Sequence, residues 1–243
     1  MNSADGLGGS DGMARLLVHV EGETEETFVY EILRPYLCGR GFTHVSPRLV
    51  GNARQRDRRG GIRAWNAVRK DIVKHLREDP ACLATTMVDY YALPQSGDNA
   101  WPGRAEAGRR PFPQKAFLVE NALAEDISRE MGAGFNPNRF IPFVMMHEFE
   151  GLLFSDCGRF AGGIGRPELE PQFQTIRDQF DSPEEINDSP LTAPSKRVKA
   201  LVEGYEKPLL GNLAILEIGL DPIRRECPHF GAWVDQLDAW PRR

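Results

Sequence analysis

Four short apolar runs are the clearest pattern in the chain, and each has the length of a β-strand. They cover residues 16–20, 45–50, 82–89 and 140–146. Between them, apolar residues recur every three or four positions over 24–37, 62–76 and 115–131, which predicts amphipathic helices. Strands that alternate with helices are typical of an α/β fold. We therefore predict a mostly parallel sheet of about four strands, flanked by helices.

The pattern changes after Asp156, where strand-like runs end. Short helical stretches separated by Pro and Gly follow at 168–180, 195–205, 209–220 and 228–240. We expect an α/β core over residues 13–156 and a helical C-terminal region over 157–243 that packs on it. Residues 1–12, rich in Gly, Ser and Asp, are expected to form a loose tail.

The composition is that of a globular protein, with 41% hydrophobic and 27% charged residues among 243. The sequence has neither an apolar run of the ~18 residues that a membrane helix needs nor the features of a signal peptide. We expect a cytoplasmic protein. Its four cysteines lie far apart without metal-ligand spacing, and we expect them to be buried free thiols.

Basic residues are concentrated in one region, although the net charge is −5. Ten Lys or Arg and two acids lie between Arg48 and Arg77. Arginines supply most sequence-independent affinity for a phosphate backbone. A glycine-flanked loop and the helix after it are therefore candidates to bind nucleic acid through Arg54, Arg56, Arg58, Arg59 and Arg63. A solvated helix face is the alternative for the helix.

Acidic residues follow three of the apolar runs. Glu21 follows the first, Asp89 ends the third, and Glu148 and Glu150 come after the fourth. The carboxyl ends of parallel strands meet at one edge of a sheet, with neighbours ~4.8 Å apart. Clustered carboxylates repel one another unless a cation lies between them, and their hard oxygens suit Mg²⁺ or Mn²⁺. His147 is either a ligand or a core histidine.

A divalent ion can polarise a phosphoryl oxygen and activate a bound water, so a basic loop beside such a cluster favours phosphodiester chemistry. The sequence contains no phosphate-binding G-x-x-x-x-G-K-[ST] loop, no G-x-S-x-G and no H-E-x-x-H. ATP hydrolysis by the chain itself and these two hydrolase classes are therefore not expected.

Motifs along most of the chain resemble those of a known bacterial family, domain of unknown function 4276. They are Val20-Glu21-Gly22-Glu23-Thr24-Glu25, Val88-Asp89-Tyr90-Tyr91-Ala92-Leu93-Pro94, His147-Glu148-Phe149-Glu150-Gly151, Pro183-Glu184-Glu185-Ile186-Asn187, Ala193-Pro194-Ser195-Lys196-Arg197 and Cys227-Pro228-His229-Phe230. The Val-Glu-Gly strand end, with Asp89 ending a later strand, also resembles the Toprim arrangement of topoisomerases, DnaG-type primases and OLD-family nucleases.

The Toprim resemblance implies that Glu21 and Asp89 hold Mg²⁺ or Mn²⁺ and act on phosphodiesters. Tyr91 stands where the second Toprim aspartate is usual, and Glu148 and Glu150 are expected to compensate. Glu25, Tyr91 and His147 are expected to support these ligands. Related families resemble the nuclease half of two-component phage-defence systems, which implies an AAA or ABC-type ATPase partner.

Three cations of the C-terminal region complete the expected site. Lys207 is a candidate to stabilise a phosphoryl transition state, and Lys196 and Arg197 are candidates to bind nucleic acid. Each of the three is equally explained as a surface or cap residue. Self-association is left open.

The leading hypothesis is a Mg²⁺-dependent Toprim-like nuclease that cuts DNA or RNA. The alternative is a catalytically degenerate Toprim-like module that senses a phage protein or regulates the ATPase. A phosphatase or phosphotransferase that uses the same acids also stays open.

Overall fold

The computed structural model describes residues 14–50, 62–112, 114–186, 189 and 191–240. Its sheet contains β1 (Ala14–Val20), β2 (Phe42–Leu49), β3 (Cys82–Asp89), β4 (Phe140–Ile141) and β5 (Val144–Met145). The strand order is β2-β1-β3-β4, β5 also pairs with β3, and every pairing is parallel. The predicted α/β fold with a parallel sheet is confirmed.

The fourth predicted strand is split in two around Pro142. Proline has no N–H to donate to a strand ladder, so regular pairing stops there. The Thr86 hydroxyl replaces part of the ladder: it donates to the Phe143 carbonyl at 2.9 Å and accepts from the Phe143 N–H at 3.0 Å. This bridge keeps the chain beside β3 as far as β5, and so delivers the next residues to the end of the sheet.

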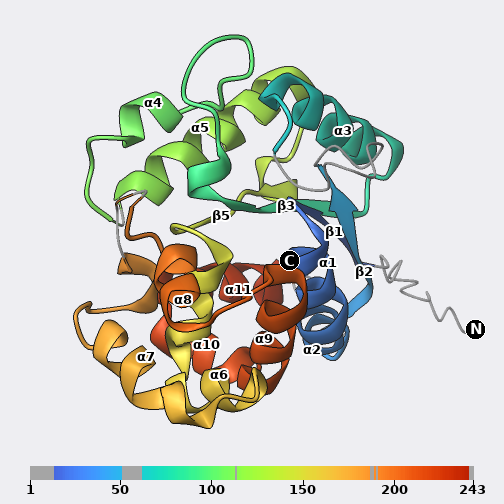
Figure 1. Ribbon diagram of the computed structural model, residues 1–243. Helices are drawn as coiled ribbons and strands as arrows, with labels where there is room; N and C mark the ends of the chain where they lie inside the picture. The colour runs from blue at the N-terminus through green and yellow to red at the C-terminus, as the bar shows by residue number, and fades with distance from the viewer. Residues whose placement is uncertain (1–13, 51–61, 113, 187–188, 190, 241–243) are drawn as a thin grey trace, which may run out of the picture.

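One face of the sheet is covered by α3 (Trp65–Glu78), the short α4 (Arg104–Ala107) and α5 (Gln114–Met131), which lie above the sheet in Figure 1. Helix α5 buries Val119, Leu123 and Ile127 as its periodicity predicts. The prediction that Phe117 belongs to this buried face is wrong, since its side chain is 65% exposed.

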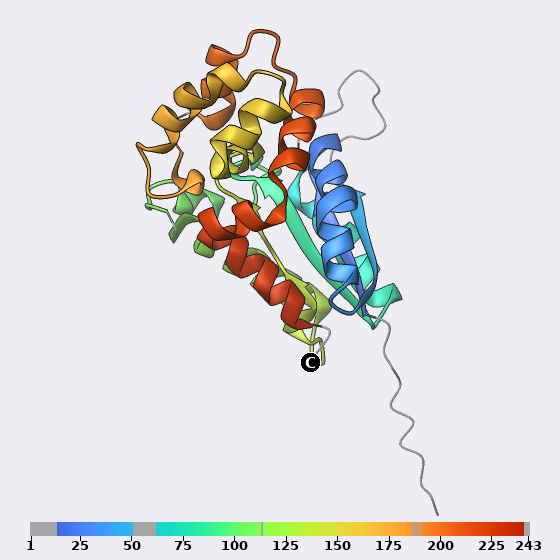
Figure 2. The same ribbon diagram turned by 90° about the horizontal axis from the view of Figure 1, so that it is seen from below.

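The other face is covered by a continuous N-terminal helix and by α11 (Pro228–Ala239) (Figures 1 and 2). The N-terminal helix consists of α1 (Glu23–Phe28), a π-helical turn (Val29–Leu33) and α2 (Arg34–Cys38). The two helices meet through Phe28 and Phe230, whose ring centres lie 5.9 Å apart. The helix begins directly after Gly22, and Thr24 is buried in its first turn.

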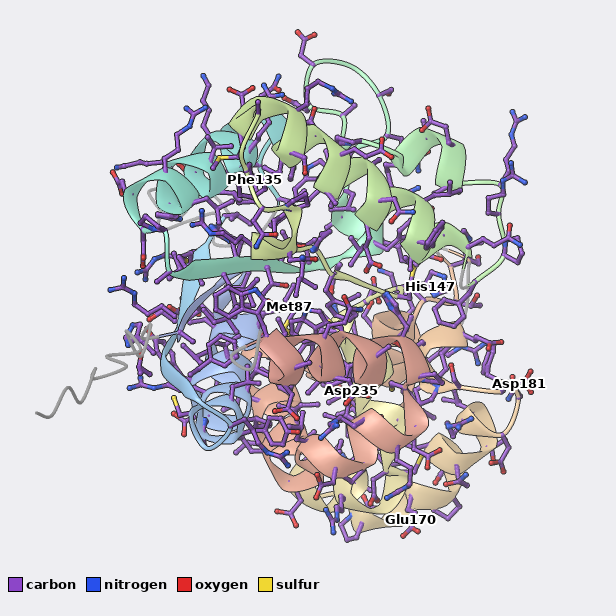
Figure 3. The ribbon with its side chains drawn as sticks, turned by 180° about the vertical axis from the view of Figure 1, so that it is seen from behind. Met87, Phe135, His147, Glu170, Asp181 and Asp235 are labelled. Atoms are coloured by element: carbon purple, nitrogen blue, oxygen red, sulfur yellow. The ribbon has the colours of Figure 1, made fainter. Side chains whose placement is uncertain are left out.

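The C-terminal region is helical, as predicted. It contains α6 (Cys157–Gly163), α7 (Glu170–Arg177), α8 (Pro194–Leu201), a π-helical turn (Lys207–Gly211), α9 (Asn212–Ile218), α10 (Leu220–Glu226) and α11. Its apolar side chains form one buried cluster with those of β1 and the N-terminal helix. In Figure 3, Met87 of β3 lies between the sheet and α11. The helical region therefore packs directly on the sheet.

Other expectations from composition have mixed outcomes. Cys82, Cys157 and Cys227 are buried free thiols as expected, whereas Cys38 is exposed. None of the helices in the described ranges has the length and apolar character needed to cross a bilayer. The expected tail, residues 1–12, lies outside the described residues.

A buried ionic cluster joins the first turn of α11 to α5, across the edge of the sheet. The His229 Nε2 atom lies 2.9 Å from Glu120 Oε1, and its Nδ1 atom lies 3.6 Å from Glu184 Oε1. Glu184 also accepts the backbone N–H groups of His229 and Phe230. Burial alone lowers the pKa of His229, but hydrogen bonds to Glu120 and Glu184, and their charges, raise it to about 9.

This cluster predicts a pH-dependent contribution to stability. The folded-state pKa of His229 lies above its ordinary value of 6.5, so its contribution is complete below about pH 6.5 and is lost as the pH rises through about 9. We expect His229→Gln to lower the free energy of unfolding by about 2–3 kcal/mol near pH 6, and by much less near pH 10. Urea unfolding at both pH values measures this, with His44→Gln, an exposed histidine, as the control. An equal cost at both pH values would contradict a charged His229.

Candidate functional site

The candidate site forms where β1 and β3 end side by side. Val20 lies opposite Met87 in the parallel register, so Glu21 and Asp89 emerge at the same edge of the sheet. Asp89 lies opposite Met145 of β5, which leads within a few residues to the 3₁₀-helix Phe149–Ser155 and Glu150. The expected neighbourhood of Glu21, Asp89 and Glu150 is therefore present.

The ammonium group of Lys207 lies at the centre of these acids. Its Nζ atom is 2.9 Å from Glu25 Oε1, 3.1 Å from Asp89 Oδ2 and 3.7 Å from Glu150 Oε2. The three carboxylates are buried, whereas the Lys207 side chain keeps 27% of its surface exposed. The sequence analysis predicted a divalent metal ion among the acids, whereas in the folded chain the ammonium group of Lys207 lies among three of them.

Backbone groups fix the orientation of two of these carboxylates. Asp89 Oδ1 accepts the Phe149 N–H at 2.9 Å, which leaves Oδ2 for Lys207. Glu25 Oε2 accepts the Gly22 N–H at 3.1 Å, which leaves Oε1 for the same ammonium. Each carboxylate is thus held by one oxygen and presents the other to the centre of the cluster.

Glu21 differs from the other acids because its charge is poorly compensated. One of its oxygens, Oε2, is buried and has no hydrogen-bond partner among the described residues. Burial raises the pKa of Glu21 to about 7. The positive charge of Lys207 and a backbone hydrogen bond from Asp89 oppose this shift, and the negative charges of Glu25 and Glu150 add to it. The site therefore contains a carboxyl group that exchanges a proton near neutral pH.

The other charges of the cluster are also perturbed. Burial raises the pKa of Asp89 well above its usual range and raises that of Glu150, although Lys207 opposes both shifts. Burial alone would lower the pKa of Lys207, but Asp89, Glu25 and Glu150 together raise it, so the amine stays protonated. Three acids pair with one ammonium group, so the acidic side chains outnumber the cation that lies among them.

Glu148 and the aromatic residues lie at the edge of this cluster. Glu148 Oε2 accepts the Ser195 N–H at the start of α8, at 2.9 Å. The His147 side chain is buried and stacks on Tyr91, with ring centres 5.3 Å apart. Figure 3 shows His147 beyond the end of the sheet, between α5 and the helical region. Glu148 therefore has a contact at α8, and it also lies near enough to Glu150 for its charge to raise the pKa of that carboxyl.

The candidate nucleic-acid residues are only partly described. Arg54, Arg56, Arg58 and Arg59 lie outside the described residues. Arg63 precedes α3 and pairs with Asp71 at 2.8 Å. Arg197 of α8 donates to the Thr192 carbonyl and lies over the Phe180 ring, and Lys196 beside it is exposed. Arg63 and Arg197 therefore have structural contacts, and nothing in them requires nucleic acid.

Sequence reasoning missed the central position of Glu25 and a cavity of about 380 Å³ beside the cluster. Glu25 lies in the first turn of a helix, where acids commonly complement the helix dipole, so its sequence position does not reveal its burial. The cavity contains the buried Arg104 and Lys115, which flank the end of a Pro- and Gly-rich stretch. Long loops in compact domains are often functional, and this rule is a sequence signal that could have drawn attention to the segment.

The comparison with protein families gives one match. The model of the family described as domain of unknown function (DUF4276) matches residues 20–238. No curated protein and no solved structure is similar enough to match.

Proposed function

We propose that this chain, which belongs to the DUF4276 family, is a Mg²⁺- or Mn²⁺-dependent nuclease that hydrolyses phosphodiester bonds in nucleic acid. The observation that carries the proposal is the convergence of Glu21, Asp89 and Glu150 with Glu25 at the carboxyl edge of a parallel sheet. In open α/β sheets, ligands bind at this edge.

The donor atoms and the charge of the cluster suit a divalent cation. All four acids offer hard oxygen ligands, and Glu21 Oε2 is buried without a hydrogen-bond partner among the described residues. Within the same ranges, no three His, Cys, Asp or Glu side chains already form a metal-binding set, and the Lys207 ammonium lies among the oxygens. Mg²⁺ would therefore compete with Lys207 for Asp89, Glu25 and Glu150.

The residues of this chain would have separate roles in the reaction. A bound divalent ion supplies Lewis acidity toward a phosphoryl oxygen and an acidified water. Glu21, with a pKa of about 7, is able to hold or release a proton near neutral pH. Lys207 presents a fixed positive charge to the negative charge that develops on the phosphoryl group. Asp89, held by the Phe149 N–H, orients the ammonium.

Glu21→Gln tests the proposal because it is expected to lower the rate of cutting while it raises the stability of the fold at pH 8. We expect purified chain to nick DNA or RNA with Mg²⁺ or Mn²⁺, and the variant to cut at least about 100-fold more slowly. The pKa of Glu21 is raised from 4.5 to about 7, so its ionised form destabilises the fold above about pH 7 and this cost is absent below about pH 4.5. The neutral variant should therefore be about 1–3 kcal/mol more stable at pH 8 without metal.

The matched control for this test is Glu78→Gln, which removes an exposed carboxylate at the end of α3. It should leave cutting unchanged. Wild-type cutting rates in the Glu21→Gln protein, measured on a nicked-plasmid gel with the metal titrated, would exclude Glu21 from the chemistry.

The second candidate function is a binding or scaffold module without catalysis. Lys207 favours it, because this ammonium already pairs with three of the acids, and Tyr91 stands in place of the usual second aspartate. Calorimetry with Mg²⁺ and Mn²⁺ separates the two functions. Absence of metal binding at millimolar concentration favours the module, and binding that Asp89→Asn removes favours the nuclease.

An ATPase partner, a role in phage defence and a cytoplasmic location are parts of the same proposal. The partner and the defence role rest on the resemblance to two-component defence nucleases, and the location rests on the apolar pattern of the sequence, in which no run has the length of a membrane helix. The direct check is to express the chain with the ATPase encoded beside its gene, if one is found, and to compare cutting by the pair with cutting by the chain alone.

A further inference from the structure

A groove between α3 and α5 carries an excess of positive charge. These helices cover the face of the sheet opposite to the C-terminal helices (Figure 1), and the groove has a volume of about 370 Å³. The charged residues that line it are four cations and two acids: Arg69, Lys70, Lys74, Arg77, Glu78 and Glu130. The net charge of the whole chain is −5, so the groove differs in sign from the chain as a whole. Such a groove attracts anions.

Three of these cations form a row along α3. Lys70, Lys74 and Arg77 are separated by four and three residues, so they lie on one face of the helix, and all three are exposed. An α-helix rises ~1.5 Å per residue, so the row is about 10.5 Å long. Successive phosphates of one strand in a duplex are ~3.4 Å apart along its axis. The row therefore spans about three phosphate intervals, which is more than one small anion needs.

The charges of this row are available to a ligand. Lys70 has no ion-pair partner in the part of the chain that the structure describes. Arg77 donates to the backbone carbonyl of Glu130 at 2.9 Å, and this neutral partner leaves the guanidinium charge in place. Lys74 lies 3.8 Å from Glu78, with side chains that are 67% and 61% exposed. Ion pairs as exposed as this one add little to stability, so Lys74 can exchange Glu78 for a phosphate at small cost.

Arg69 and Asp126 hold the two sides of the groove together. Arg69 lies 3.2 Å from Asp126 and 3.8 Å from Glu130, both on α5. Asp126 also accepts the indole N–H of Trp65 at 2.7 Å, at the start of α3. These contacts fix α3 against α5. The row of cations is therefore presented on a rigid helix, and no loop has to become ordered before an anion binds.

The groove lies at a distance from the acidic cluster. Val144 of β5 is opposite Val88, next to Asp89, and its N–H donates to Glu120 of α5 at 2.9 Å. This part of α5 is therefore beside the end of the sheet. Glu130, which lines the groove, follows Glu120 by ten residues, or about 15 Å along the helix axis. At ~3.4 Å per phosphate, a strand needs about five nucleotides to cover that distance.

We propose that the groove between α3 and α5 binds the sugar-phosphate backbone of one strand of nucleic acid through Lys70, Lys74 and Arg77. Contacts of Lys and Arg with phosphates supply most of the sequence-independent affinity for nucleic acid. The inference rests on the proposed function and deepens it, because it names where a substrate is held away from the bond that is cut. The groove sets the affinity for strands longer than about five nucleotides, and the acids act on the bond.

Fluorescence anisotropy in EDTA tests the groove without any contribution from metal-dependent cutting. The probe is a labelled single strand of DNA of about 20 nucleotides, measured at several salt concentrations. We expect Lys70→Gln/Lys74→Gln to weaken binding by at least about tenfold and to reduce the salt slope by about one for each lysine. Lys70→Arg/Lys74→Arg should bind as wild type does. The matched control is Lys199→Gln/Arg225→Gln, which removes the same charge from exposed positions of α8 and α10.

The outcomes separate this inference from the proposed nuclease. Strand binding that the groove variant loses, without cutting by any form of the protein, supports the groove and refutes the nuclease. Cutting by wild type, with unchanged strand affinity in the groove variant, refutes the groove alone. An equal loss of affinity in the control variant reports net charge and also overturns the inference.

Cutting and competition give two further tests. The groove variant should raise the concentration of the long strand at half-maximal cutting, and should leave both the rate at saturation and the cutting of a strand of about four nucleotides unchanged. Equal effects on both strands would place the lost contacts at the acids and overturn the inference. Poly-glutamate that binds more tightly than the DNA strand would assign the groove to an acidic protein, which also overturns it.

Discussion

Asp89→Asn is expected to abolish metal-dependent cutting, with a fall in rate of at least about 100-fold. Asp89 uses both oxygens: Oδ1 accepts the Phe149 N–H, and Oδ2 pairs with Lys207. Asparagine can keep the first contact, but it then turns its amide N–H₂ toward an ammonium group. The variant therefore loses a negative charge and a ligand at the centre of the cluster while the nearby backbone keeps its hydrogen bond.

The measurement is the initial rate of nicking over a range of Mn²⁺ and Mg²⁺ concentrations, with melting temperature as a check on folding. Asp71→Asn is the matched control, since Asp71 pairs with Arg63 on the outer surface of α3. If Asp89→Asn folds normally and still cuts at the wild-type rate, the cluster is not the catalytic site.

Lys207→Met is expected to lower the free energy of unfolding strongly, and the size of this loss is expected to depend on whether a divalent metal ion is present. Methionine keeps most of the apolar stem but removes the ammonium that pairs with Glu25, Asp89 and Glu150. Breaking a buried ion pair by removing one partner costs ~3–5 kcal/mol. Because the Lys207 side chain is 27% exposed, we expect about 2–4 kcal/mol in EDTA.

Millimolar Mg²⁺ should restore at least half of this loss if the acids can hold a divalent ion. The ion would replace the missing charge without competition from the ammonium, and binding to the folded state alone raises stability. Chemical denaturation of Lys207→Met with EDTA or Mg²⁺ measures the effect, with Lys199→Met on the surface of α8 as the control. If Mg²⁺ stabilises Lys207→Met no more than the control, the metal-dependent proposal fails and the binding module is favoured.

The two variants together also distinguish roles within the cluster. Asp89→Asn should lose both metal binding and cutting. Lys207→Met should bind metal at least as well as wild type yet cut poorly, because its charge toward the phosphoryl group is gone. Such a split cannot arise from general unfolding.

The sequence by itself determined the strands, their direction and the presence of acids at their ends. The run Cys82–Asp89 matches the observed strand because a strand buried on both faces is mostly apolar, and the hydroxyls of its two threonines donate to backbone carbonyls. Glu21 and Asp89 could be placed at the same edge of the sheet from the alternation of strands and helices, and the pairing of β1 with β3 in the structure makes them neighbours. These are local patterns, and they carry enough information to fix the fold class.

Only the tertiary structure decided which charged groups meet. Lys207 is separated from Asp89 by 118 residues, and its place among the acids depends on how the C-terminal helices pack on β1. The same packing buries Glu25, sends Glu148 to the start of α8 and brings Arg104 and Lys115 to one cavity. Charge and helical periodicity show that a residue can face inward. The partner of that residue is set by contacts between segments that are distant in the sequence. These contacts determine whether an acidic cluster holds an ammonium group, a proton or a metal ion.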